Sequence, residues 1–242
     1  MSLSSTGETL FPPWAPFSQQ TYLSVVSYSY TALVTGGTGK LGGAIAARLG
    51  AEGFRVKSAG TRDGDLAQAS EARALVAEAV AQLGGLDLLV NAASAGFAPK
   101  PFAEVTEDEW DAALGATAKG SFFVTQAAAP YLRQSSLGLV VMIEDVAAYQ
   151  AWPSFAAHCA AKAAQAMLTR VLARALAPEV RVCGIAPGPV AVEPDQVERR
   201  AAETLLGRVG SPDDVADAVL FLTRAPFVTG TSLLVDGGRL LT

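Results

Sequence analysis

The sequence predicts a protein of the doubly wound α/β class, in which helices cover both faces of a parallel sheet. Three observations support this class. Predicted strands and helices alternate along most of the chain, the strands are continuously apolar, as expected for strands buried on both faces, and a glycine-rich turn joins the first strand to the first helix. With 242 residues, half of them apolar, the chain can bury the core of one such domain without metal or disulfide support.

The elements of the first part of the chain follow this alternation. The apolar end of residues 27–37 predicts a buried strand, and residues 40–50 predict a helix with apolar residues at helical spacing. Residues 70–84 predict a second helix, and residues 86–94 predict an apolar strand that breaks into small residues. This order of strand, turn, helix and strand is typical of a parallel sheet.

The middle of the chain shows clearer helix starts. A helix is predicted over residues 106–132, because Thr106 and Glu109 match a capping box at its start. Residues 138–145 predict the next apolar strand. The alanine-rich residues 155–176 predict a long helix after it.

The last part of the chain completes the pattern. Residues 180–188 predict a strand, and residues 231–238 predict a short final one. Between them, residues 211–222 predict a helix whose Ser-Pro-Asp-Asp start supplies a cap, a first-turn proline and acidic partners for the helix dipole.

One interval is too short for this alternation of strands and helices. Residues 54–64 must hold the second strand and the start of its route across the sheet, and a parallel crossover normally needs a dozen or more residues, usually as a helix. We therefore predict a shortened crossover after the second strand, with no complete helix between Arg55 and Asp65. One sheet edge is then thinly covered, unless the N-terminal arm or a second subunit covers it.

Residues 1–29 predict an N-terminal arm that precedes the domain of residues 30–242. Three prolines prevent a regular element in its first part, yet its aromatic residues could pack on an apolar surface, so a disordered arm and a docked arm both stay open. No Lys or Arg precedes Lys40, and no apolar run reaches spanning length. We therefore expect neither a targeting signal nor a membrane span.

Charge and cysteine content narrow the partners. The net charge of -5 and the pI near 5.0 argue against a nucleic-acid partner, because no basic stripe exists to replace counterions. The two cysteines, Cys159 and Cys183, lack zinc-ligand spacing, so we expect no metal site, two reduced buried thiols and a cytoplasmic protein.

The glycine turn is the first candidate site. Five glycines lie between the first strand and the first helix, at positions 36, 37, 39, 42 and 43. Backbone amides and the helix dipole can receive a pyrophosphate at such a place. Glycine-rich turns also form for packing alone, so this second interpretation stays open at the level of the turn.

Several motifs together resemble the short-chain dehydrogenase/reductase family. "TGGTGKLG" (35–42) resembles its TGxxxGxG turn, "NAAS" (91–94) its NNAG stretch, and "IAPGPV" (185–190) the Pro-Gly loop beside the nicotinamide; "GRVGSPDDVADAVLFL" and "VTGTSLLVDGG" resemble its C-terminal signature. The resemblance covers residues 30–242 and implies a Rossmann-like domain that binds NAD or NADP. The cofactor residues it implies are Thr35, Gly36, Gly37, Gly39, Lys40, Leu41, Gly42, Arg62, Asp65, Leu66, Asn91, Ala92, Ala93, Lys162, Pro187, Gly188 and Val190.

Within the family, the chain looks most like the pteridine-reductase branch. Lys40, Ser94 and Asp145 match a basic residue in the glycine turn, NNAS in place of NNAG, and Asp in place of the active-site Ser. Phe97 lies within one position of an aromatic residue that stacks on the pterin there, so Ser94, Phe97 and Asp145 are the substrate residues that the resemblance implies. Two alternative interpretations stay open. Lys40 is then a solvated residue at the start of a helix, and Phe97 an apolar residue of a loop.

The stretch "HCAAK" (158–162) carries the catalytic hypothesis. In the family, a Tyr and a Lys four residues apart share one helix face, and the Lys holds the nicotinamide ribose and lowers the pKa of the phenol. Here Lys162 fills the Lys position and His158 the Tyr position, Asp145 lies at the family's spacing before them, and Thr117 stands where an Asn usually supports the proton relay. Asp145 could deliver the proton with His158 relaying it, or His158 could be an ordinary histidine at the edge of the core.

The choice of cofactor rests on few residues. Lys40 and Arg62 favour the 2'-phosphate of NADP, whereas Asp63 and Asp65 oppose it if they face it. Asp65 with Leu66 is more similar to the family's Asp-Leu pair beside the adenine. We therefore expect NADP and keep NAD as the alternative.

These observations predict a reductase that transfers a hydride from NADPH to a C=N or C=O of a small, planar substrate. Two alternatives stay open: a nucleotide-binding sensor or partner subunit that has lost turnover, and a scaffold of the same fold with non-redox chemistry and no dinucleotide. The resemblance also implies a homo-oligomer, a dimer or tetramer. The resemblance implies that residues 191–207 form the variable lid that sets the substrate in such folds.

Overall fold

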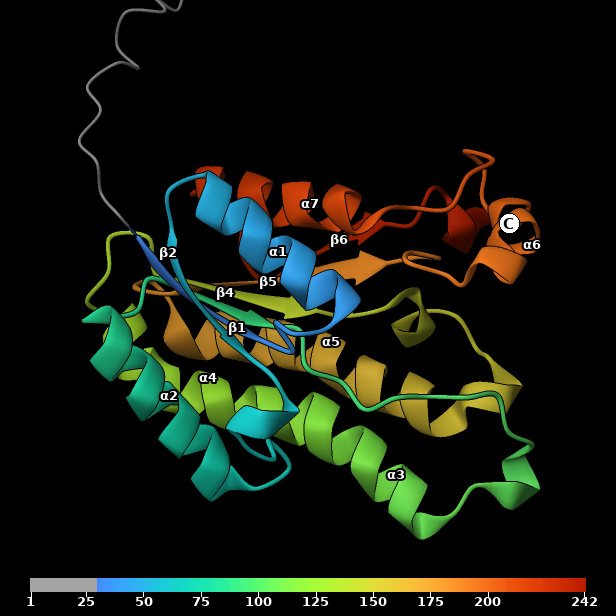
Figure 1. Ribbon diagram of the computed structural model, residues 1–242, viewed down its shortest axis with the longest axis horizontal. Coiled ribbons are helices and arrows are strands. Elements are labelled where there is room, and N and C mark those ends of the chain that lie inside the picture. Colours follow the sequence, from blue (N-terminus) through green and yellow to red (C-terminus); the bar gives the residue numbers. More distant parts are fainter. Residues whose placement is uncertain (1–29) are drawn as a thin grey trace, which may run out of the picture.

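A computed structural model describes residues 30–242, so the arm predicted for residues 1–29 lies outside the described residues. The predicted doubly wound class is confirmed: six parallel strands form one sheet in the order β2-β1-β3-β4-β5-β6, with helices on both faces (Figure 1). The strands are β1 (Thr31–Thr35), β2 (Arg55–Ala59), β3 (Leu88–Asn91), β4 (Leu139–Ile143), β5 (Arg181–Pro187) and β6 (Ser232–Val235). The helices are α1 (Lys40–Ala51), α2 (Ala69–Leu83), α3 (Glu107–Leu114), α4 (Gly120–Leu132), α5 (Ala156–Leu176), α6 (Val197–Ala201) and α7 (Pro212–Arg224).

The sheet separates two apolar layers. Side chains alternate along β1, so Leu33 packs against the layer that contains α2 and α4, while Ala32 and Val34 face the layer of α1 and α7. Figure 1 shows α1 and α7 above the sheet and α2, α4 and α5 below it. The central strands are therefore covered on both sides, which explains why their sequences are apolar without interruption.

The chain reverses its direction of travel across the sheet at β1. Strand β2 pairs with one edge of β1 and β3 with the other, and the connections that leave β1 and β3 run to α1 and α4 on opposite faces, which makes this a topological switch point. In open α/β sheets, ligands bind in the crevice at this point. The region beyond Thr35 and Asn91, the last residues of these two strands, is therefore the candidate binding site.

The predicted shortened crossover is confirmed. Between β2 and α2 the chain forms a single 3-10 turn at Thr61–Asp63 and no complete helix. A classic six-stranded dinucleotide-binding sheet has the order 3-2-1-4-5-6, with one more strand outside the second. That outer strand is missing among residues 30–242, so β2 is an edge strand, where Lys57 forms ion pairs with Glu78 of α2 and with Asp63.

Both predicted helix starts are present. The hydroxyl of Thr106 accepts from the Glu109 amide at 3.3 Å, and the Glu109 carboxylate accepts from the Thr106 amide at 2.9 Å. The same reciprocal pair joins Ser211 and Asp214 at the start of α7, with Pro212 in its first turn. These caps satisfy amide groups that a helix leaves without partners.

The helix predicted over residues 106–132 is not continuous, which corrects the sequence interpretation. A π-helical turn at Gly115–Lys119 separates α3 from α4. The loop that leads into α2 passes close to this turn: a Cβ on Gly115 would lie 2.9 Å from Ala67 Cβ, and one on Gly120 would lie 3.0 Å from Leu66 Cβ. Single π-helical turns are frequent at functional sites, and this one carries Thr117.

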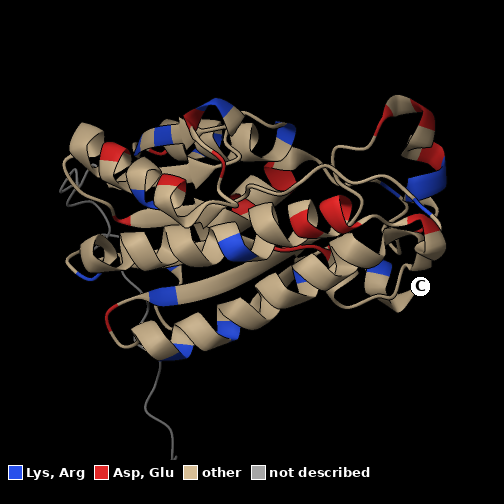
Figure 2. Ribbon diagram, turned by 90° about the horizontal axis from the view of Figure 1, so that it is seen from below, with Lys and Arg blue, Asp and Glu red and all other residues tan. Residues whose placement is uncertain are grey.

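The surface charges are mixed. On the face seen in Figure 2, basic and acidic residues alternate over the helices, and no continuous basic stripe is visible. Over residues 30–242, every helix is too short or too polar to cross a bilayer.

Candidate active site

The glycine turn brings the backbone of β1 and β3 into close contact. Gly36 has a φ of +65°, and a Cβ on it would lie 2.7 Å from the carbonyl oxygen of Ala92. The hydroxyl of Thr35 accepts from the amides of Ala92 and Ala93, both at 3.2 Å, which fixes the two strand ends together. A Cβ on Gly42 would collide with the Gly36 carbonyl, so glycine is required at both positions by this packing.

A cavity of about 550 Å³ lies at this turn, at the switch point of the sheet. The residues implied for the cofactor that line it are Thr35, Gly36, Gly39, Asp65, Leu66, Ala92 and Ala93. Those that do not line it are Gly37, Lys40, Leu41, Gly42, Arg62, Asn91, Lys162, Pro187, Gly188 and Val190. Sequence reasoning missed Thr38, Ala59, Gly60, Thr61 and Ala116, which also line it. Ala59, Gly60 and Thr61 could have been found, because they lie at the end of β2, beside the glycine turn.

The residues that surround this cavity fit a dinucleotide. Helix α1 begins beside this turn, and its first turn carries no acidic residue to repel a diphosphate. Side chains are absent at Gly36 and Gly39, which lets a ligand approach the backbone. Asn91 is buried at the end of β3, and its Oδ1 is the only buried side-chain oxygen or nitrogen without a hydrogen bond among the described residues.

Lys40 does not face the crevice in this structure. Its ammonium forms an ion pair at 2.7 Å with Glu193, which lies in the segment after β5. Both side chains are more than half exposed, so the pair adds little to stability. The pair nevertheless joins the start of α1 to the predicted lid at residues 191–207.

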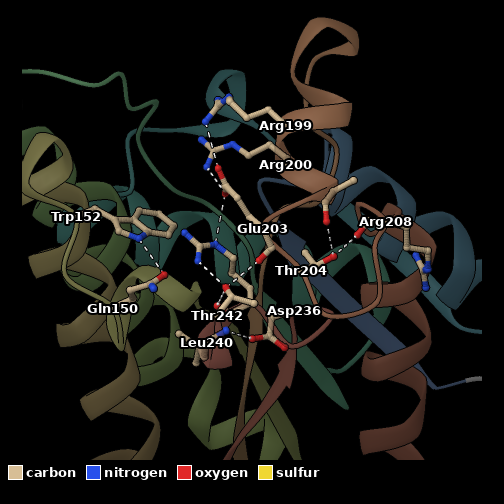
Figure 3. Close-up of polar contacts among 12 residues, drawn as sticks. Gln150, Trp152, Arg199, Arg200, Glu203, Thr204, Arg208, Asp236, Leu240 and Thr242 are labelled. Carbon is tan, nitrogen blue, oxygen red and sulfur yellow. Dashed lines mark hydrogen bonds and ion pairs between the residues drawn. The ribbon is translucent and has the colours of Figure 1, made fainter.

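The opposite end of that lid is fastened to the C-terminal residues. Glu203 lies between the guanidinium groups of Arg199, Arg200 and Arg239, at 3.3, 3.0 and 3.4 Å (Figure 3). The Thr242 hydroxyl also donates to the Glu203 carbonyl at 3.0 Å. The end of α6 is therefore held in place.

The Pro-Gly loop follows the carboxyl end of β5, at the same end of the sheet as the glycine turn after β1. Gly188 packs directly against Asp236. A Cβ on Gly188 would lie 2.7 Å from the Cα of Asp236. Val190 pairs with Gly210 and lines a separate cavity of about 460 Å³ near β6. Pro187 ends β5, next to the end of β4.

The structure brings Asp145 and His158 together. Asp145 follows the end of β4, and its Oδ1 accepts from the Ala147 amide at 2.7 Å, which caps a short 3-10 turn. Its Oδ2 lies 3.3 Å from Nε2 of His158 in the first turns of α5. His158 is 5% exposed and lies where the sheet and α5 meet. The pair can share a proton, because one partner is a carboxylate and the other an imidazole.

Lys162 lies one helical turn from His158 but points into the core. Its Nζ donates to the Ile143 carbonyl at 2.8 Å and to Gln165 Oε1 at 3.0 Å, and the residue is 5% exposed. The helix face is thus the predicted one, whereas the ammonium is bound to protein groups instead of facing the crevice. Burial lowers the pKa of Lys162 from 10.5 to about 8, and the charges of Asp145 and Glu144 oppose this shift.

This pKa sets a pH dependence of stability. The unfolded amine keeps its pKa of 10.5, so between about pH 8 and 10.5 the folded state binds fewer protons, and stability rises with pH over this window. Relative to Lys162→Met, the native chain is expected to gain up to about 3 kcal/mol of unfolding free energy from pH 8 to 10.5. Urea denaturation at a series of pH values measures the difference, and a flat difference contradicts the assignment.

Ser94 and Thr117 form the remaining polar pair of the site. Their hydroxyl oxygens are 3.1 Å apart, which joins the loop after β3 to the π-helical turn. The Thr117 carbonyl accepts from Ser121, whose hydroxyl accepts from Gln165, the partner of Lys162. A continuous set of hydrogen bonds therefore links the buried ammonium to the position where the resemblance implied a proton relay.

Phe97 lies against the imidazole. The ring centroids of Phe97 and His158 are 3.9 Å apart and the planes are inclined by 26°, so the two rings are stacked. Phe97 is 55% exposed, so its other face is open to solvent. The phenyl ring covers one face of His158 and limits the directions from which a substrate can reach it.

Sequence reasoning missed Glu144, the neighbour of Asp145. Glu144 is 2% exposed, and its carboxylate accepts from Thr169 at 2.6 Å and from Tyr149 at 2.8 Å. Gly184 of β5 provides the space that this carboxylate occupies, because a Cβ there would collide with Glu144 Oε1. A glycine inside an apolar strand often marks such a close approach, and that was the available signal.

Comparisons with known proteins agree with this geometry. A family model described as Enoyl-(Acyl carrier protein) reductase matches residues 38–239. The human protein Dehydrogenase/reductase SDR family member 4 is 32% identical over 239 residues, which cover 86% of this chain and 86% of that protein. The chain belongs to the short-chain dehydrogenase/reductase family.

Solved structures of other proteins superpose closely on the chain. The ligand-free aldohexose dehydrogenase of Thermoplasma acidophilum has a TM-score of 0.83 at 25% identity, over 89% of this chain and 96% of that one. A blue fluorescent protein from a metagenomic library, solved in complex with NADPH, has a TM-score of 0.78 at 28% identity, over 87% and 97%. The names of these relatives are those of oxidoreductases or of an NADPH-binding protein.

Proposed function

We propose that this family member is an NADP-dependent reductase that transfers a hydride to a C=O or C=N of a small substrate, in the manner of pteridine reductases. The observation that carries the proposal is the position of the Asp145–His158 pair at the carboxyl end of the parallel strands, where the glycine-lined crevice also lies. The NADPH complex of a similar structure supports a nicotinamide cofactor.

The cofactor contributes the hydride when it is bound, and the protein contributes binding and the proton. The amides after Thr35 and the amino end of α1 would bind the diphosphate. Asp65 and Leu66 would lie beside the adenine, in the cavity that they line. Lys162 would reach the ribose only if its side chain leaves Ile143 and Gln165.

The Asp145–His158 pair would supply the proton. Nε2 of His158 faces Asp145, so the carboxylate can accept from Nε2–H and orient the ring, and Nδ1–H would donate the proton to the substrate. The substrate carbon gains the hydride and its oxygen or nitrogen gains the proton, so C=O becomes CH–OH and C=N becomes CH–NH. The role resembles that of a buried Asp that orients a catalytic His.

Replacing Arg62 by Ala is expected to weaken NADPH binding by about tenfold, with NADH binding unchanged. Arg62 is exposed beside Thr61, at the rim of the crevice, where a guanidinium can bind a 2'-phosphate. The negative charge of Asp63 is offset by an ion pair with Lys57, and its carboxylate accepts from the Gly60 amide. Tryptophan fluorescence measures both affinities.

Arg133→Ala is the matched control for this prediction. Arg133 is equally exposed but lies at the end of α4, away from the crevice. It should leave both affinities unchanged. Equal losses for NADPH and NADH in Arg62→Ala would contradict 2'-phosphate recognition.

The variant His158→Tyr tests the proposed chemistry. If the imidazole donates the proton, the variant loses turnover with carbonyl and pterin substrates while NADPH affinity stays the same. A rise in turnover would show instead that the phenol of the family is still accommodated and that histidine impairs the site. Failure to bind NADPH at millimolar concentration would contradict the proposal as a whole.

A second candidate function is nucleotide sensing without turnover. The inward position of the Lys162 ammonium, bonded to Ile143 and Gln165, favours it. This candidate predicts that NADPH binds, that no substrate of a broad panel is reduced, and that Lys162→Ala leaves the biological effect unchanged. The proposed reductase predicts the opposite result for turnover.

We propose that the protein works as a cytoplasmic dimer or tetramer. Apolar side chains are exposed on α5, at Met167 and Val171, and on the edge strand β6, at Leu234. The family resemblance assigns assembly to these two elements. Both cysteines are free thiols, which suits a reducing compartment.

A further inference from the structure

A second cavity touches the dinucleotide crevice at Ser94. It has a volume of about 440 Å³ and lies between the loop after β3, the helix α3 and the start of α5. Cavities of this size hold a ring system or a short chain. Its apolar wall consists of Phe97, Pro99, Pro101, Val105, Ala113 and Phe155. We refer to this cavity as the apolar groove.

Charge at the apolar groove opposes an anionic ligand. Lys100 is the only Lys or Arg among the described residues that line it, and its ammonium already binds both oxygens of Glu109, at 2.7 and 2.8 Å. This interaction is the main reason that the pKa of Glu109 is lowered to about 2. Glu104 adds a further carboxylate at the rim. Among the described residues that line it, the groove therefore offers no unpaired Lys or Arg side chain to a carboxylate or sulfonate.

The inner end of the apolar groove is polar and adjoins the proposed reaction centre. His158, Thr117 and Ser94 line this end. The phenyl ring of Phe97 stacks on the imidazole there and contacts Phe155 edge-on, at a centroid distance of 5.8 Å. The Phe97 ring covers one face of the imidazole, so a ligand can stack on that face only when the exposed ring turns aside.

We propose that the apolar groove binds the body of the substrate, and that this body is a neutral aromatic or alkyl group with the reacting C=O or C=N at the end next to His158. The inference rests on the proposed reductase function and specifies its substrate class. Apolar walls, with no unpaired Lys or Arg among the described residues that line the groove, select neutral groups. Phe97 leaves the imidazole when the substrate enters.

The test fills the groove with a side chain. Ala113→Phe places a phenyl ring in the groove, and Ala112→Phe adds the same ring to the exposed neighbour on α3 as a matched control. The probe is the neutral dye N-phenyl-1-naphthylamine, followed by fluorescence without cofactor. We expect Ala113→Phe to weaken dye binding by about tenfold and Ala112→Phe to leave it unchanged. Val105→Trp, on the loop before α3, repeats the test if Ala113→Phe does not fold.

Kinetics give the substrate class. With NADPH, 2-naphthaldehyde should have a lower KM than 6-formyl-2-naphthoate, and Ala113→Phe should raise the KM of the neutral aldehyde by about tenfold with little change in kcat. Equal dye binding by both phenylalanine variants, or preference for the carboxylate, would overturn the proposal. Dye binding in the groove without any turnover would overturn the reductase function and leave the groove as a binding site. NADPH binding, measured separately, distinguishes the two failures.

Discussion

Replacing Asp145 by Asn is expected to lower kcat by about 10²- to 10⁴-fold, with NADPH affinity unchanged. The Asn carbonyl can still accept from the Ala147 amide, which Asp145 Oδ1 now does at 2.7 Å, so the local turn is kept. The negative charge 3.3 Å from His158 Nε2 is lost, and the Asn amide is a donor where a carboxylate oxygen was an acceptor. The imidazole then loses the acceptor that orients its Nε2–H.

Steady-state kinetics with a saturating carbonyl substrate measure this effect. Asp213→Asn removes one exposed carboxylate from the first turn of α7, far from the site, and serves as the control for net charge. Thermal unfolding shows that Asp145→Asn remains folded. A kcat within twofold of the native value would show that the pair does not supply the proton.

Replacing Gly184 by Ala is expected to cost about 3–5 kcal/mol of stability. The added Cβ would collide with Glu144 Oε1 and lie 2.6 Å from the hydroxyl of Ser232. Glu144 must then move, which breaks its bonds with Thr169 and Tyr149 and leaves a buried carboxylate without partners. Gly184 lies in β5, which pairs with β4, so the position of β5 against β4 depends on the space between Gly184 and Glu144.

Chemical denaturation measures the loss, and a double-mutant cycle assigns its cause. In the background of Glu144→Ala the collision with the carboxylate is absent, so Gly184→Ala should cost about 1–3 kcal/mol less there. Gly50→Ala is the matched control, because no atom lies within 4 Å of a Cβ at this position in α1. It should be neutral or stabilise the protein by up to about 1 kcal/mol. Equal costs in both backgrounds would contradict the role of Glu144.

Much of the fold follows from local patterns in the sequence. Continuous apolar strands, the two capping boxes and the short interval after β2 are encoded by residues that lie close together in the chain. The π-helical turn at Gly115–Lys119 was not predictable from local patterns, and the loop at Leu66 and Ala67, which packs on it, lies far away in the sequence. The apolar pattern of residues 106–132 is equally compatible with an unbroken helix.

The candidate site was also predictable only in part from the sequence. The register of Asp145, His158 and Lys162 places them at one end of the sheet, and the contact of the first two follows from it. The direction of the Lys162 side chain depends on Ile143 and Gln165, which only the tertiary structure brings to it. A long flexible side chain has many rotamers, so its partner cannot be read from spacing.

A crystal structure of the protein with NADPH tests the central claim most directly. The account predicts that the diphosphate lies on the backbone amides after Thr35, and that the nicotinamide ring lies beside Asp145 and His158. A closed crevice, or a nicotinamide ring remote from a separated Asp145 and His158, would contradict it.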